Sequence, residues 1–124
     1  MKILIIDDSE IIYNRLNKFI SRNIDNPRDS VEAISQLENL LIDIHQKAPD
    51  ILIINTYSLR GILVETIRAV KTILPQTYII CLTEFYENSF EKILRNAGAD
   101  HFLDIANGIE QFQDIFTNVK ENFL

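Results

Sequence analysis

Apolar residues in this chain form short unbroken runs, separated by longer stretches in which they recur every three or four positions. An unbroken aliphatic run is typical of a strand buried on both faces of a sheet. Five segments are predicted as strands on this basis: 2–6, 30–35, 51–54, 77–82 and 101–105. The second of these is the weakest, so we expect it near an edge of the sheet.

The stretches that follow the strands carry apolar residues at helical spacing, and each of them predicts one amphipathic helix. Ser9 can cap the first helix, and Gly98 suits the end of the fourth. The five predicted apolar stripes are Ile12, Leu16, Phe19 and Ile20; Leu37, Leu40, Leu41 and Ile44; Leu63, Ile67, Val70, Ile73 and Leu74; Phe90, Ile93, Leu94 and Ala97; and Ile109, Phe112, Phe116, Val119 and Phe123.

Repeated strand–helix units predict an α/β fold, a doubly wound five-stranded parallel sheet with helices on both faces. Right-handed crossovers and the flavodoxin-like strand order 2-1-3-4-5 place the ends of the first and third strands side by side. The length of 124 residues excludes a barrel of eight such units. We therefore expect a single domain over residues 1–124.

Polar residues stand where the first and third strands end. Asp7 and Asp8 follow the first strand, and Asn55 follows the third. Open α/β sheets place their chemistry at these strand ends, so the three side chains are expected to line one crevice. Two adjacent carboxylates repel each other, and a divalent cation or a proton relieves the repulsion. A third carboxylate at position 55 would complete a magnesium and phosphoryl site, but a carboxamide stands there.

The net charge of −6 argues against binding to nucleic acid or to an anionic membrane surface. No apolar stretch approaches the ~20 residues of a membrane span, and the first residues are too acidic for a signal peptide. These features predict a cytoplasmic protein. The only cysteine, Cys81, lies among aliphatic residues and is expected in the core.

Four segments, 5–9, 49–54, 80–83 and 97–103, resemble the receiver domain of two-component response regulators in order and spacing. The resemblance covers essentially the whole chain and implies a role in phosphorelay signal transduction. In the family, an aspartate after the third strand forms an acyl phosphate, and an acid pair holds a magnesium ion. The resemblance implies that Asp7 and Asp8 are this acid pair. It also implies that Thr83 supplies the hydroxyl that contacts the phosphoryl group and that Phe102 is the aromatic switch residue.

The chain departs from the family pattern at two positions that carry the chemistry. Asn55 occupies the phosphoacceptor position, and Ile105 occupies the position of the lysine that pairs with the phosphoryl group. A neutral amide is a poor nucleophile, and an aliphatic side chain carries no charge. The sequence therefore predicts an atypical receiver that is not phosphorylated at the usual site, is not an enzyme and needs no cofactor.

Several alternatives for the acid pair remain open. In the interpretation we favour, Asp7 and Asp8 are hydrogen-bonded to loop amides and water. Weak magnesium binding through Asp7 or Asp8 with the Asn55 oxygen is a second interpretation. Arg60 could fold back as a substitute cation, which requires it to lie within ~6 Å of the acids. Phosphorylation of the neighbouring hydroxyls, Thr56, Tyr57 or Ser58, is disfavoured because no base adjoins them.

The resemblance also implies where partners bind, since receivers signal through the face of the fourth helix, fifth strand and fifth helix. Phe85 and Tyr86, just before the fourth helix, are candidate contacts for a protein partner. The rival function is a regulator that keeps magnesium binding or residual phospho-handling at the acid pair. A flavin carrier is disfavoured, because the acid pair repels a phosphate and no Gly-rich phosphate loop is present.

Overall fold

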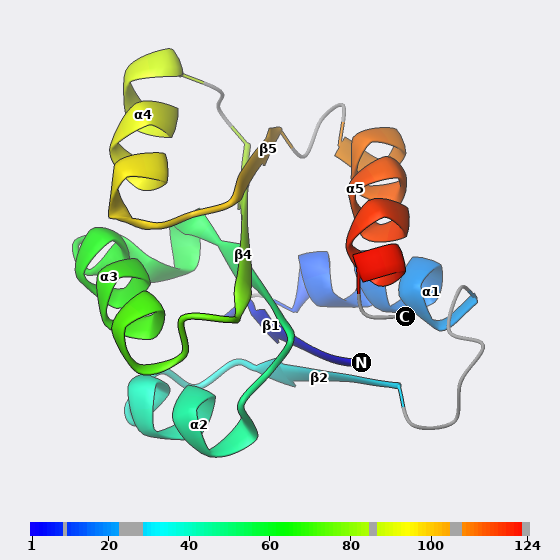
Figure 1. Cartoon of the computed structure of the whole chain (residues 1–124), viewed down its shortest axis with the longest axis horizontal. Helices are drawn as coiled ribbons and strands as arrows, with labels where there is room; N and C mark the ends of the chain where they lie inside the picture. Colours follow the sequence, from blue (N-terminus) through cyan, green and yellow to red (C-terminus); the bar gives the residue numbers. More distant parts are fainter. Residues whose placement is uncertain (9, 23–28, 85–86, 105–107, 123–124) are drawn as a thin grey trace.

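The computed structural model describes residues 1–8, 10–22, 29–84, 87–104 and 108–122. Within them the chain alternates strands and helices from end to end (Figure 1). The strands are β1 (Lys2–Ile6), β2 (Ser30–Ile34), β3 (Ile51–Asn55), β4 (Tyr78–Thr83) and β5 (His101–Asp104). The helices are α1 (Ile11–Arg22), α2 (Leu40–Lys47), the short 3-10 helix η1 (Thr56–Leu59), α3 (Leu63–Ile73), α4 (Asn88–Ala97) and α5 (Gly108–Asn122).

The five strands form one parallel sheet in the order β2-β1-β3-β4-β5, which confirms the predicted topology. Strand β2 lies at an edge, as expected, and β5 lies at the other. The aliphatic runs of β1 and β3 are paired along their length, with Ile3 opposite Ile51 and Ile6 opposite Ile54. This pairing brings the ends of β1 and β3 together.

Helices cover both faces of the sheet (Figure 1). On one face, α2, α3 and α4 pack against alternate residues of the strands, and on the other face α1 and α5 do the same. Between α1 and α5, the rings of Phe19 and Phe112 meet edge to face, with their centroids 5.6 Å apart. Every residue of β3 is buried, which explains its continuous hydrophobic run.

Three residues predicted to face the core are exposed instead: Leu41, Ile73 and Ile93, at 40%, 42% and 52%. Helix α2 begins only at Leu40, so its eight residues bury the i, i+4 pair Leu40 and Ile44 and leave the next position outside. Similarly, α3 and α4 bury narrower stripes than predicted. Ser9, Ile105 and Phe123 lie outside the described residues, as does the side chain of Ile109.

Gly98 ends α4 as the sequence predicts. Its φ of 127° lies in the region that favours glycine, and its N–H donates to the carbonyls of Leu94 and Arg95. The turn leads directly into β5. None of the helices in the described part of the chain has the length and apolarity needed to cross a bilayer.

Candidate functional site

Asp7 is fully buried where β1 ends. Its Oδ2 accepts a hydrogen bond from the backbone N–H of Tyr13 in the first turn of α1, at 3.0 Å. Its Oδ1 accepts one from the side-chain amide of Asn55, at 3.1 Å. A buried carboxylate is costly unless hydrogen bonds compensate it, and a helix N-terminus favours negative charge. The surrounding donors therefore make the buried position of Asp7 tenable.

The side chain of Asn55 is oriented by two hydrogen bonds. While its Nδ2 donates to Asp7, its Oδ1 accepts from the backbone N–H of Tyr57 at 3.2 Å and so caps η1. Reversing the amide would set oxygen against oxygen and nitrogen against nitrogen, which loses both bonds. The amide therefore faces the acid crevice with its nitrogen and turns its oxygen toward η1.

Asp8 is exposed and pairs with Ser58. The hydroxyl of Ser58 donates to Oδ1 of Asp8 at 2.8 Å, and the N–H of Asp8 donates to the same hydroxyl at 3.1 Å. Ser58 is 9% exposed. This reciprocal pair joins the loop after β1 to η1.

Sequence reasoning considered Ser58 only as a disfavoured phosphoryl acceptor and missed its contact with Asp8. The available signal was its spacing of three residues from Asn55. In a 3-10 helix, side chains three positions apart lie on one side. Asn55 and Ser58 therefore both face the end of β1, while Tyr57 between them is 62% exposed.

Magnesium does not fit these residues as they are arranged. Mg²⁺ requires oxygen ligands in near-octahedral geometry. Asn55 presents a nitrogen donor to the crevice, and both oxygens of Asp7 already accept hydrogen bonds. In the described residues, no group of three or more His, Cys, Asp or Glu side chains could hold a metal ion.

Arg60 does not act as a substitute cation in this structure. Its guanidinium lies over the ring of Tyr57, 4.1 Å from the ring centroid. The ion pairs formed among the described residues include none between Arg60 and Asp7 or Asp8. The hydrogen bonds described above come to both carboxylates from neutral donors.

The remaining candidate residues that the structure describes, Thr83 and Phe102, lie on β4 and β5. Thr83, the last residue of β4, is 6% exposed and lies one position beyond the Asn55–Leu82 register pair. Phe102 is buried beneath α4, where its ring meets that of Phe90 edge to face at 5.7 Å. Ile105, Phe85 and Tyr86 lie outside the described residues.

Burial shifts the pKa of titratable side chains elsewhere in the structure, Cys81 and His101 among them. Burial in the core raises the pKa of the Cys81 thiol to about 12, so the structure confirms Cys81 as a core residue. Burial also lowers the pKa of His101 below its ordinary value, helped by the positive charge of Arg95 and opposed by Asp100. The ring of His101 lies 5.3 Å from that of Tyr78.

Solved structures share this fold over nearly the whole chain. The signal receiver domain of a DNA-binding response regulator from Colwellia psychrerythraea 34H is 14% identical, with a TM-score of 0.87 and 98% of each chain covered. A two-component response regulator from Clostridium difficile is 17% identical, with a TM-score of 0.84 and coverage of 99% of this chain and 98% of that one. The chain has the receiver fold.

A third receiver-fold structure was determined in an activated state. The beryllofluoride-activated NtrC4 receiver domain dimer is 18% identical, with a TM-score of 0.82 and coverage of 99% of this chain and 98% of that one. No protein-family model and no curated protein sequence matches the chain. The comparisons therefore establish the fold, and the chemistry must be argued from the chain's own residues.

Proposed function

We propose that this chain is an atypical receiver domain that works in signal transduction through protein–protein contacts and takes no phosphoryl group at position 55. It has no enzyme activity of its own in this proposal, needs no cofactor, binds no nucleic acid and acts in the cytoplasm. The hydrogen bond from the Asn55 amide to the buried Asp7 carboxylate supports the proposal most directly.

The chemistry of position 55 follows from that bond. The lone pair of the Nδ2 atom is delocalised into the amide, and its hydrogen is directed at Asp7. The Oδ1 atom, the better nucleophile of the two, accepts the N–H of Tyr57 and so points into η1. Attack on phosphorus by either atom would break a hydrogen bond of a residue that is only 6% exposed. Asn55 is therefore a structural group.

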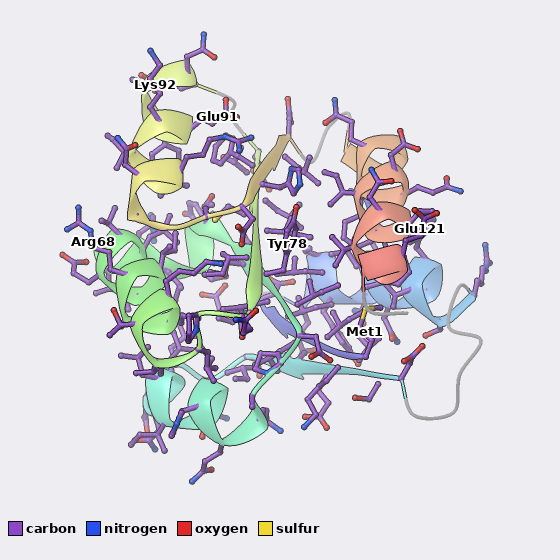
Figure 2. All side chains as sticks on the ribbon, in the orientation of Figure 1. Met1, Arg68, Tyr78, Glu91, Lys92 and Glu121 are labelled. Carbon is purple, nitrogen blue, oxygen red and sulfur yellow. The ribbon has the colours of Figure 1, made fainter. Side chains whose placement is uncertain are left out.

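The proposed contact surface is the face formed by α4, β5 and α5. In Figure 1, β5 lies between these two helices, and it is an edge strand of the sheet. An edge strand presents unpaired backbone groups that a partner can use. On α4, Ile93 is 52% exposed and its neighbour Lys92 projects away from the body of the molecule (Figure 2). Ile93 thus offers a partner an exposed aliphatic side chain on α4.

Beryllofluoride with Mg²⁺ tests the proposal, because it mimics a phosphoryl group on a carboxylate. Backbone amide NMR shifts of this chain should not respond to the mixture. The Asn55→Asp variant is the control, since it restores the carboxylate while Asp7 and Asp8 stay in place. Saturable shift changes around position 55 in the unmodified chain would refute the proposal.

The rival function is a regulator that senses magnesium through the acid pair. One observation favours it: Asp8 is exposed, and its described side-chain hydrogen bond uses only Oδ1. Addition of Mg²⁺ without beryllofluoride separates the two functions. Saturable shifts near Asp8 under that condition support the rival, and unchanged shifts support the interaction domain.

A further inference from the structure

We infer that Ser58 and Asn55 together form a built-in, uncharged replacement for a metal ion at the acid pair, and that Ser58 weakens metal binding independently of Asn55. This inference rests on the proposed function, in which position 55 carries no phosphoryl group. It goes further by assigning a role to Ser58 and by predicting that a carboxylate at position 55 restores a magnesium site only in part.

The two side chains come from one short turn. Asn55 precedes η1 and Ser58 lies within it, three residues later, so the 3-10 geometry sets both on the side that faces the end of β1. Each then reaches a different carboxylate. The amide of Asn55 donates to Asp7 at 3.1 Å, and the hydroxyl of Ser58 donates to Asp8 at 2.8 Å.

Both hydrogen bonds are held in place by a second one. The oxygen of Asn55 accepts from the N–H of Tyr57, and the hydroxyl of Ser58 accepts from the N–H of Asp8. The N–H of Asp8 holds the Ser58 oxygen beside the carboxylate, and the hydroxyl hydrogen then points to the nearest acceptor, Oδ1 of Asp8. Neither donor can swing away without losing two hydrogen bonds.

The arrangement compensates charge as a cation would, but with neutral groups. Asp7 also accepts from the N–H of Tyr13 at a helix N-terminus. The donors to Asp7 and Asp8 described above, an amide, a hydroxyl and a backbone N–H, are all uncharged. Hydrogen bonds to a charged group are the stronger kind, so a metal that uses Oδ1 of Asp8 competes with the Ser58 hydroxyl for that oxygen.

Ser58 and Asn55 should therefore affect magnesium affinity separately. Asn55→Asp supplies a third carboxylate near Asp7 but leaves the Ser58 hydroxyl on Asp8. Removing that hydroxyl as well frees the Asp8 oxygen and the loop beside it. Magnesium affinity should therefore rise in two steps, the second of which depends on Ser58 alone.

Calorimetric titration with MgCl₂ tests this on four proteins: the unmodified chain, Asn55→Asp, the double variant Asn55→Asp/Ser58→Ala, and the control Asn55→Asp/Ser21→Ala. Ser21 is exposed on α1 and bonds to Asn17, so its change is chemically matched and remote from the acids. We expect no saturable binding by the unmodified chain. The Ser58 double variant should bind about tenfold more tightly than Asn55→Asp and than the control.

Equal affinities in the Ser58 double variant and Asn55→Asp would overturn the role of Ser58 and leave the proposed function standing. Saturable binding by the unmodified chain would overturn the inference as a whole. Phosphorylation at position 55 is a separate measurement, and its detection would refute the proposed function. If Ser58→Ala does not fold with Asn55→Asp, Ser58→Cys replaces it, because a thiol fills the space but is a weak donor.

Discussion

The amide nitrogen of Asn55 lies 3.1 Å from Oδ1 of Asp7, and both residues are buried at the meeting point of β3 and β1. In this position a third carboxylate would face Asp7 with like charge. The amide instead supplies a donor, so the crevice is internally compensated. The stability of the fold and the proposed loss of phosphotransfer thus depend on the same contact.

Replacing Asn55 by alanine should destabilise the protein by about 2–4 kcal/mol, because it leaves the buried Asp7 carboxylate and the Tyr57 N–H without their partner. Urea denaturation measures the change. Asn14→Ala, at an exposed position of α1, is the matched control and should change stability by less than about 0.5 kcal/mol. If Asn55→Ala loses as little stability as the control, the contact between Asn55 and Asp7 does not stabilise the fold.

The proposed partner surface can be tested with two exposed isoleucines on different helices. Ile93 on α4 is 52% exposed and Ile42 on α2 is 58% exposed, so both can be changed to aspartate with little effect on the core. We expect Ile93→Asp to weaken binding of the physiological partner at least tenfold and Ile42→Asp to leave it unchanged. Loss of binding only in Ile42→Asp would place the contact on α2 and would contradict the proposed surface.

Acid sensitivity should depend in part on His101. Its pKa is lowered in the folded chain by burial, so in the window between that lowered value and 6.5 the unfolded chain binds more protons. The free energy of unfolding therefore falls as the pH drops through this window and is recovered above it. His101→Gln should flatten the dependence of stability on pH between about pH 7 and about pH 5.

Chemical denaturation at each pH gives this slope directly. His45→Gln, at an exposed position in the last turn of α2, is the matched control. A slope that is the same in the His101 variant and in the unmodified chain would mean that the burial of this ring has no effect on protonation.

Cys81 should be unreactive in the native protein. It is fully buried, and burial raises its pKa to about 12, so almost none of it is thiolate at about pH 8. Iodoacetamide should modify the thiol only after unfolding in guanidinium chloride, which intact mass detects. Rapid native labelling would indicate that β4 opens on the time scale of the reaction.

The sheet could be predicted from the sequence because β1 and β3 are buried on both faces and therefore read as unbroken aliphatic runs. Right-handed crossovers then place the end of β1 beside the end of β3, and therefore Asp7 beside Asn55. The contact between Ser58 and Asp8 could not be predicted in the same way. It depends on the chain forming a 3-10 turn after β3, and short turns of this kind leave no periodic pattern.

The width of the buried face of each helix could not be predicted from the sequence pattern either. Leu41 and Ile93 extend apolar stripes in the sequence, but each stands on the outer side of its helix. Periodicity shows that a helix has an apolar face, whereas the number of residues that the face buries is set by the neighbouring elements. Helix α4, for example, must fit between α3 and β5.

Incubation with acetyl phosphate and Mg²⁺, followed by intact mass spectrometry, shows whether position 55 accepts a phosphoryl group. We expect the unmodified chain to gain no phosphoryl group, because the amide of Asn55 is held on Asp7 and cannot serve as the acceptor. A stable mass increase of one phosphoryl group that maps to the segment containing Asn55 would contradict it.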